Sequence, residues 1–357
     1  MKDMRLLVEL QSYGIRAEGV QILGRKGGAG PAEGIILLID GKPLSVPLES
    51  PYVKYSPYQL IEEKGSYWLE KDSIKVCKVS FRDSPRFYQF SSSDGTPLQK
   101  IGLLHGLDCF ASTVIQNCFL WESIQSCKFC GIGLSLKKGL TTALKKPEQL
   151  AEAADIAYKL DRITHITLTT GSTPTGEAEI KYLGICTRAI LEKINIPVHV
   201  QFLPPQDIGL LSELKDCGVS TVGIHIESFD PNILAKVAPF KFTMGFEHYQ
   251  KIWTKAVQIF GRNQVSSFVI VGLGESQDSV IKGCQMLATM GVYPYIVPLR
   301  PIPGSELENK TPPLPQYMIP IYERVSMILK ENGLSSEKSL AGCIRCGSCS
   351  CLSEFEE

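Results

Sequence analysis

The chain has 357 residues, and its 37 lysines and arginines balance 37 aspartates and glutamates, which leaves no formal net charge. This balance excludes the global attraction that draws proteins to nucleic acid or to anionic membranes, so we expect neither as a partner. Hydrophobic residues make up 44% of the chain, as in globular proteins, and no run of about 18 apolar residues predicts a membrane span. The N-terminus lacks the apolar core of a secretory signal, so we expect a cytoplasmic protein.

Residues 1–104 are predicted to form a β-rich N-terminal region. Apolar and β-branched residues are concentrated in three runs, at residues 5–9, 34–39 and 73–81. Asp40 and Gly41 follow the second run and are typical of a two-residue hairpin turn. The glycine-rich segment 24–34 has no Walker pattern and no clear helix behind it, so we interpret it as a flexible loop rather than a phosphate-binding loop.

Residues 105–310 alternate between strand-like and helix-like segments. The expected strands are 112–117, 164–169, 197–202, 222–227, 265–271 and 293–299, and the expected helices are 147–159, 177–193, 206–217, 246–260 and 276–290. Pro147 suits a first helical turn, and Gly218 and Gly291 lie where helices should end. Six successive β/α units predict a parallel sheet that is either doubly wound or curved into a barrel.

The faces of the strands favour the barrel. Within residues 198–202, His199 and Gln201 lie on the face opposite the apolar residues, and the segments 164–169 and 222–227 alternate in the same way. A doubly wound sheet is apolar on both faces, whereas a curved sheet can enclose a polar lumen. We therefore predict an α/β fold with a partial (β/α)6 barrel, an N-terminal β-rich appendage and a cysteine-rich C-terminal tail.

Cys118, Cys127 and Cys130 follow the first expected strand of the barrel with the spacing C-x8-C-x2-C. Clustered thiolates are the usual ligands of iron–sulfur clusters and of structural zinc. Three ligands leave one corner of a cubane cluster open for a small molecule. Zinc would want two tight pairs, and only Cys127 and Cys130 form one, so an iron–sulfur cluster is preferred over zinc or structural cysteines.

Residues 311–357 are expected to form a helix at 312–333 and then a second thiolate group. This group consists of Cys343, Cys346, Cys349 and Cys351, spaced C-x2-C-x2-C-x-C. A short glycine-containing tail has no core in which to bury structural cysteines, so a second iron–sulfur cluster is preferred, with zinc as the alternative. The fourth ligand stays open between Cys351, Ser350 and a residue distant in the sequence.

With a cysteine loop after the first strand of a six-unit β/α region, residues 105–310 resemble the radical SAM superfamily. The resemblance implies that Cys118, Cys127 and Cys130 bind a [4Fe-4S] cluster whose open iron holds S-adenosyl-L-methionine (SAM). The loop usual in this superfamily is C-x3-C-x2-C, whereas eight residues separate the first two cysteines here. Cys109 is therefore an alternative first ligand, and Cys118 is preferred because it lies next to the end of the expected strand.

The resemblance also implies a set of cofactor-binding residues. Phe129 is expected near adenine, the turn formed by Thr169, Thr170 and Gly171 at the methionine amino group, Glu227 at the ribose hydroxyls, and Gly272 and Gly274 near adenine. Arg300 belongs to this set if it pairs with a substrate or cofactor carboxylate, and capping of neighbouring carbonyls is an equal alternative. No catalytic side chain is expected beyond the cluster and cofactor ligands.

The cysteine loop, the strand bearing Glu227 and the segment LRPIPGS at 299–305 most resemble the biotin synthase-related branch. Archaeal-type two-component lipoyl synthases contain proteins of this kind. The resemblance implies a sulfurtransferase with two [4Fe-4S] clusters and SAM, in which an electron from reduced ferredoxin or flavodoxin generates a 5′-deoxyadenosyl radical. Sulfur from the second cluster would enter an octanoyl chain on a lysine of a lipoyl carrier protein or peptide. A second radical SAM protein is a candidate partner.

Three other interpretations stay open. The chain is alternatively a biotin synthase-like enzyme, or a radical SAM enzyme whose second cluster relays electrons during a dehydrogenation or rearrangement. The third alternative is a zinc-binding module in which both cysteine groups hold zinc and no reaction occurs. Iron and acid-labile sulfide analysis after anaerobic purification separates the zinc module from the enzymes.

Overall fold

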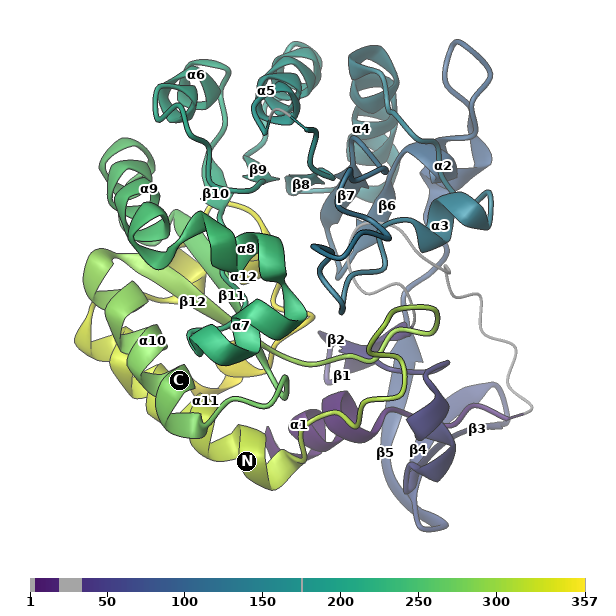
Figure 1. Ribbon diagram of the computed structural model, residues 1–357. Helices are drawn as coiled ribbons and strands as arrows, with labels where there is room; N and C mark the ends of the chain where they lie inside the picture. The colour runs from purple at the N-terminus through teal and green to yellow at the C-terminus, as the bar shows by residue number, and fades with distance from the viewer. Residues whose placement is uncertain (1–3, 19–33, 175, 357) are drawn as a thin grey trace.

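The computed structural model describes residues 4–18, 34–174 and 176–356. These residues form an N-terminal antiparallel sheet and a larger α/β half-barrel, and the C-terminal segment contacts both (Figure 1). The glycine-rich segment that we interpret as a loop lies, except for Gly34, outside the described residues.

The N-terminal sheet has five strands in the order β2-β1-β5-β4-β3. They are β1 (Ile35–Ile39), β2 (Lys42–Val46), β3 (Tyr58–Glu63), β4 (Ser66–Lys71) and β5 (Ile74–Phe81). Asp40 and Gly41 connect β1 to β2 with φ angles of 51° and 80°, and Ile39 pairs with Lys42. Two consecutive positive φ angles are typical of a type I′ turn, so the predicted hairpin is confirmed.

The first element is a helix, α1 (Met4–Tyr13), and the predicted strand at residues 5–9 is wrong. Leu6 and Leu10 are both buried and stand four residues apart, which is the spacing of one face of a helix. Val8 and Glu9 are buried as well. The periodicity of so short an apolar run does not distinguish a helix from a strand.

The larger unit contains a seven-stranded sheet in the order β12-β11-β10-β9-β8-β7-β6. Strands β7 to β12 are parallel, and β6 is an additional antiparallel edge strand. The strands are β6 (Leu103–His105), β7 (Cys109–Thr113), β8 (His165–Thr169), β9 (Val198–Gln201), β10 (Thr221–Gly223), β11 (Val265–Val271) and β12 (Val292–Pro298). The predicted partial (β/α)6 barrel is therefore confirmed.

Helices cover the outside of the curved sheet (Figure 1). The longer ones are α4 (Pro147–Asp161), α5 (Ala178–Leu191), α6 (Leu210–Asp216), α9 (Phe246–Phe260), α10 (Gln277–Met290) and α11 (Pro315–Glu331). Short helices lie in the connections: α2 (Leu98–Ile101), α3 (Leu134–Lys137), α7 (Pro231–Val237), α8 (Pro239–Met244) and α12 (Cys343–Cys346). None of the described helices is long and apolar enough to cross a membrane.

Two parallel strands are shorter than predicted at their carboxyl ends. β7 ends at Thr113 because the next residues pair with the segment before α4, where Ile115 forms a bridge with Leu144. β10 ends at Gly223, and the chain then runs beside β11 with one isolated bridge, between Glu227 and Val269. The cysteine loop therefore begins several residues after its strand rather than directly at its end.

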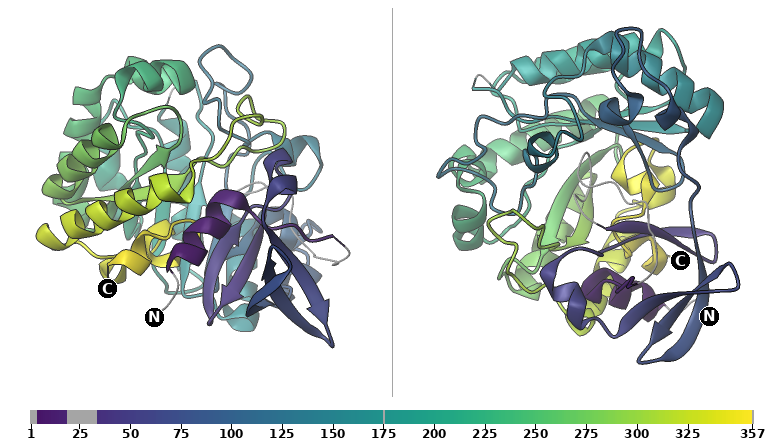
Figure 2. Two further views of the ribbon diagram at one scale, coloured as in Figure 1. Left: turned by 90° about the horizontal axis from the view of Figure 1, so that it is seen from below. Right: turned by 90° about the vertical axis from the view of Figure 1, so that its right-hand side faces the viewer.

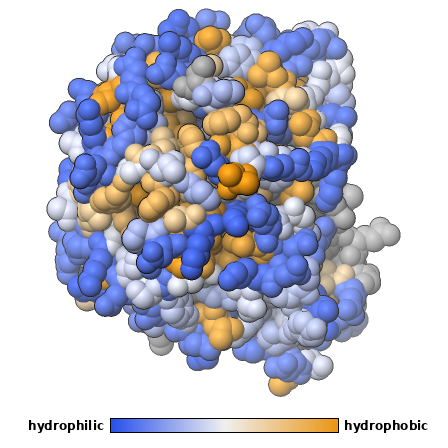
Figure 3. Space-filling view, viewed as in Figure 1, coloured by the Kyte–Doolittle hydropathy of each residue, from blue (hydrophilic) through white to orange (hydrophobic). Residues whose placement is uncertain are grey.

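The interior of the half-barrel is polar and is occupied by the C-terminal segment. His165 and His199 are buried, and His199 Nδ1 lies 2.7 Å from Thr221 Oγ1. A Cβ on Gly342 would lie 2.6 Å from His199 Cγ, so the chain after α11 passes directly against the buried histidine of β9. Figure 2 shows the same C-terminal segment beside α1, on the side of the N-terminal sheet. On the face drawn in Figure 3, hydrophilic side chains predominate and apolar ones lie among them in small groups.

Candidate functional site

A pocket of about 190 Å³ opens at the carboxyl ends of β8 and β9, and Cys118, Cys127 and Cys130 all line it. Thr169, the last residue of β8, and Gln201, the last residue of β9, line the same pocket. Ligands of parallel α/β sheets bind at this edge of the sheet. The structure thus brings the three cysteines of the loop together at the place where the fold positions a ligand.

Local turns shorten the eight-residue spacing between Cys118 and Cys127. Trp121 N donates to Cys118 O (2.9 Å), and further along the loop Ser126 N donates to Ser123 O (3.1 Å). These turns absorb the additional length, so Cys118 faces the same pocket as the other two cysteines. Cys109, the alternative first ligand, begins β7 at the opposite end of the strand and does not line this pocket.

Two thiols of this loop are protonated at neutral pH as long as no metal is bound. Burial raises the pKa of the Cys127 thiol to about 11 and that of Cys130 to about 12. A metal that binds them must displace their protons. Among the described residues that line the pocket there is no fourth cysteine, and this three-sulfur donor set fits a cubane with one open iron.

Five further predicted residues line the same pocket, namely Phe129, Thr169, Thr170, Gly171 and Glu227. Among these residues, Gly171 lies closest to the backbone of the cysteine loop. A Cβ at this position would lie 2.1 Å from Asn117 O and 3.1 Å from Cys118 Cα. Because real Cβ atoms do not come so close to a carbonyl oxygen, only glycine lets the end of β8 pass beside the start of the cysteine loop.

Three predicted cofactor residues lie outside the pocket lining: Gly272, Gly274 and Arg300. Gly272 and Gly274 belong to a turn with φ angles of 106° and 123°, and Gly272 N donates to Glu275 Oε1 (2.7 Å). Arg300 donates from Nη1 to Ser45 Oγ (3.0 Å) and from Nη2 to Ser45 O (2.8 Å). Arg300 therefore binds a carbonyl of the N-terminal sheet, as in the capping alternative.

A buried ion pair that was not predicted from the sequence lies at the pocket. Lys241 of α8 donates from Nζ to Glu227 Oε1 (2.6 Å) and to His225 O (2.6 Å). Burial alone would lower the pKa of Lys241, but the Glu227 carboxylate outweighs burial and raises it above its usual value. Glu227 also has a φ of 73°, an uncommon conformation for a residue with a Cβ. The pair thus fixes a carboxylate in a strained backbone position at the pocket wall.

His225 presents an unpartnered donor to the same pocket. Its ring stacks on Phe268 at 4.1 Å, and Phe268 N donates to its Nδ1 (3.1 Å). Burial and then the charge of Lys241 lower the pKa of His225 well below its usual value, so the ring is neutral. Since Nδ1 accepts a hydrogen bond, the proton is on Nε2, which is buried without a partner among the described residues. Such an orphaned donor in a pocket wall fits a bound ligand that supplies an acceptor.

The tail cysteines form a second group behind this pocket. Gln201, which lines the pocket, places its Nε2 3.4 Å from Cys343 Sγ. Cys346 Sγ lies 3.4 Å and Cys349 Sγ 3.7 Å from the ring nitrogens of His105 in β6. Cys343, Cys346 and Cys349 therefore lie next to β9 and β6 of the half-barrel. All twelve cysteines of the chain are free, and within the described ranges no three His, Cys, Asp or Glu side chains are arranged to hold a single metal ion.

Comparison with known proteins supports the family resemblance. The model of a family described as the radical SAM superfamily matches residues 124–287. A bacteriochlorophyllide c C-7(1)-hydroxylase from Chlorobaculum limnaeum is 24% identical over 221 residues, which cover 57% of this chain and 55% of the relative. This chain thus spans about half the length of that curated relative.

A solved structure has a similar fold. A methylornithine synthase superposes with a TM-score of 0.50 at 15% identity, covering 64% of each chain. A radical SAM methyltransferase from Sphaerobacter thermophilus has a TM-score of 0.48 at 13% identity, covering 80% of this chain and 76% of the other. At these identities the likeness to the synthase concerns the fold alone.

Proposed function

We propose that this chain is a radical SAM enzyme that inserts sulfur at an unactivated carbon, using a second iron–sulfur cluster held by its tail. One observation carries the proposal: Gln201 both lines the cysteine-loop pocket and lies 3.4 Å from Cys343 Sγ. A single side chain thus separates the pocket from the tail cysteines. A substrate carbon in the pocket would lie next to a sulfur source.

The residues of the pocket have separate tasks in this proposal. Cys118, Cys127 and Cys130 would hold the [4Fe-4S] cluster, and together with SAM it supplies hydrogen abstraction from carbon when bound. Glu227 accepts from ribose hydroxyls with its second oxygen while Lys241 orients the carboxylate. The Nε2 proton of His225 is donated to an acceptor on the cofactor or the substrate.

Apolar side chains complete the pocket and exclude water. Leu120, Ile132, Phe202 and Leu203 line it beside the cysteines. A dry wall protects a reactive carbon centre from side reactions. It also suits an acyl chain, and we propose the octanoyl group on a lysine of a lipoyl carrier protein or peptide as the substrate. Each carbon–sulfur bond replaces one carbon–hydrogen bond, so one SAM is consumed for each sulfur bond formed.

The test follows sulfur from the protein to the product. The protein is reconstituted with iron and ³⁴S-sulfide and incubated with SAM, reduced ferredoxin or flavodoxin and octanoylated carrier peptide, with and without a candidate second radical SAM protein. We expect ³⁴S in the product, and we expect 5′-deoxyadenosine but no thiolated product from the Cys343→Ala, Cys346→Ala, Cys349→Ala variant. Unlabelled sulfur in the product, or thiolation by the variant, contradicts the proposal.

Hydroxylation is the second candidate, because the curated relative is named as a hydroxylase. The same incubation distinguishes the two by product mass. A product that gains oxygen contradicts sulfur insertion. An unsaturated product that gains neither oxygen nor sulfur contradicts it as well. In both cases the tail cluster has another role. Biotin synthase-like chemistry is separated by replacing the octanoyl peptide with dethiobiotin.

A further inference from the structure

His105, the last residue of β6, lies between two cysteines of the tail. Its Nδ1 is 3.4 Å from Cys346 Sγ and its Nε2 is 3.7 Å from Cys349 Sγ. More than 200 residues separate His105 from these cysteines, so this contact depends on the fold and not on a local motif. Imidazole nitrogen and cysteine sulfur are ligands of the same metals and clusters.

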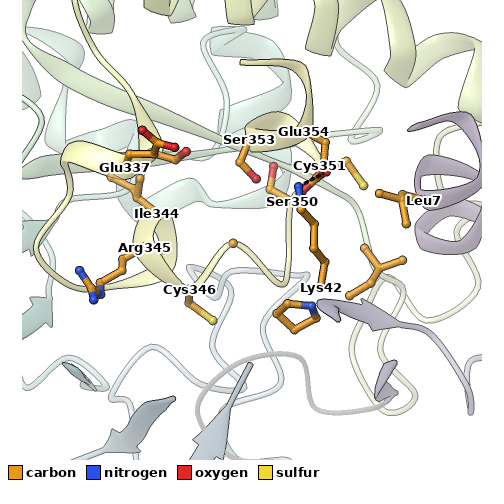
Figure 4. Close-up of a pocket in the computed structure, with 14 residues that line it drawn as sticks. Leu7, Lys42, Glu337, Ile344, Arg345, Cys346, Ser350, Cys351, Ser353 and Glu354 are labelled. Carbon is orange, nitrogen blue, oxygen red and sulfur yellow. Dashed lines mark hydrogen bonds and ion pairs between the residues drawn. The ribbon is translucent and has the colours of Figure 1, made fainter. Parts of the chain in front are cut away.

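The two neighbours proposed from the sequence as fourth ligands are engaged elsewhere. Cys351 Sγ donates to Gln11 Oε1 of α1 (3.0 Å), and Ser350 Oγ accepts from Leu352 N (3.1 Å). Figure 4 shows the sulfur of Cys351 directed towards Leu7 of α1, away from the side of the pocket on which Cys346 lies. The predicted assignment of Cys351 to the cluster therefore does not match its position, and Cys343, Cys346 and Cys349 need a ligand from outside the tail.

The backbone around His105 is shaped for this contact. Gly106 has a φ of 56°, and a Cβ there would lie 2.7 Å from Cys346 Sγ and 2.6 Å from Ser348 Oγ. Only glycine allows the turn after β6 to approach the tail so closely. The tail is held from its other side by Ser45 of β2, whose N–H donates to Ser348 O (2.7 Å). Both the histidine and the cysteines are thus positioned by rigid strands.

We propose that His105 is the fourth protein ligand of the metal group held by Cys343, Cys346 and Cys349. That this group is an iron–sulfur cluster rests on the proposed function. A histidine ligand is neutral, unlike a thiolate, and replacement of cysteine by histidine raises the reduction potential of a cluster. In the tail cluster the fourth iron would therefore be bound by histidine, whereas in the loop cluster the fourth iron has no protein ligand.

Two nearby residues serve as controls. Cys109 is buried next to Cys346 in the same apolar cluster, but its Sγ interacts with Thr167 Oγ1 (3.3 Å). His199 also lies against the tail, but its Nδ1 interacts with Thr221 Oγ1 (2.7 Å) and its Nε2 with Gln201 Nε2 (3.3 Å). Cys109→Ser and His199→Asn should leave the ligand set intact.

The experiment isolates the tail site in the full-length chain. The Cys118→Ala, Cys127→Ala, Cys130→Ala variant is labelled with ¹⁵N-histidine and reconstituted anaerobically with iron and sulfide. We expect about four irons and four sulfides per chain, and pulsed EPR of the reduced cluster should show a directly bonded nitrogen. Adding His105→Ala should abolish the nitrogen coupling and lower the iron content. Adding His105→Cys should retain the iron, abolish the coupling and lower the midpoint potential.

Each other outcome has a definite meaning. A cluster without nitrogen coupling, or a coupling that survives His105→Ala, removes His105 from the ligand set and leaves a tail cluster and the proposed function standing. Loss of iron in Cys109→Ser, or loss of the coupling in His199→Asn, reassigns the ligand and overturns the inference. Absence of iron and sulfide from the triple variant, or zinc in their place, overturns both the inference and the proposed function.

Discussion

Lys241 and Glu227 form the buried ion pair that fixes the pocket wall, with Nζ and Oε1 2.6 Å apart and both side chains 8% exposed. Removing one partner of a buried pair costs about 3–5 kcal/mol because the other charge stays behind unpaired. We expect Lys241→Met to lower the free energy of unfolding by about this amount, and the Lys241→Met, Glu227→Gln double variant to recover much of it. Urea denaturation measures both.

The same variants test the role of Glu227 in cofactor binding. Loss of a charge-assisted hydrogen bond costs about 1.5–3 kcal/mol, so Glu227→Gln should weaken SAM binding roughly ten- to hundredfold without changing the iron content. The double variant should regain stability but not affinity. If its SAM dissociation constant matches that of the wild type, Glu227 has a structural role only.

Gly171 fixes the distance between β8 and the cysteine loop. Gly171→Ala would place a Cβ 2.1 Å from Asn117 O, so the start of the loop, including Cys118, must move. Misplacement by about 1 Å can cost about a hundredfold in rate, and we expect a loss of this order in SAM cleavage together with reduced iron binding by the loop. Gly184→Ala, inside α5, is the matched control, and its cleavage rate should equal that of the wild type. Equal rates for both variants would show that the close approach is unimportant.

At the scale of elements, strong periodic segments were predictable and short connections were not. The predicted ranges 246–260 and 265–271 coincide with α9 and β11, because each segment carries a long apolar pattern. The short helices α7 and α8 have no such pattern. Lys241 was missed for that reason, although a lysine between two phenylalanines after a proline is a local indication of a partnered buried charge.

The pocket cysteines were predictable because their spacing is a property of the sequence, whereas His105 was not. Its partners come from the opposite end of the chain, and β6 is too short to be recognised from three residues. The predicted strand at residues 5–9 failed for a related reason: α1 is defined by its packing, and Gln11 meets Cys351 only in the folded chain. Tertiary contacts of this kind leave no local pattern.

Arg300 links two elements, the segment after β12 and strand β2. It donates to Ser45 Oγ and Ser45 O at 3.0 and 2.8 Å. Hydrogen bonds from a charged group contribute about 1.5–3 kcal/mol, so Arg300→Ala should lower the free energy of unfolding by about 2 kcal/mol. SAM affinity should stay unchanged, because Arg300 does not line the pocket. A matching loss of SAM affinity, measured by equilibrium binding, would return Arg300 to the cofactor site.

At the scale of the whole molecule, neutral histidines inside the half-barrel should make stability depend on pH. Burial lowers the pKa of His165 to about 4 and that of His199 to about 3, whereas both lie near 6.5 in the unfolded chain. Below pH of about 6.5 the unfolded state therefore binds protons that the folded state does not. Stability is fully present above that pH and is lost as the pH falls towards the folded pKa values.

Each histidine should contribute up to about 1.4 kcal/mol per pH unit. Because the pKa of buried His225 is lowered as well, three histidines together lower the free energy of unfolding by roughly 5 kcal/mol between pH 6.5 and 5. Urea denaturation of the metal-free, reduced protein measures this slope before most carboxylates titrate. His199→Asn should remove roughly a third of it, since asparagine binds no proton. If His199→Asn leaves the slope unchanged, the lumen admits water and protons. The interior would then lack the exclusion of water on which the proposed radical chemistry depends.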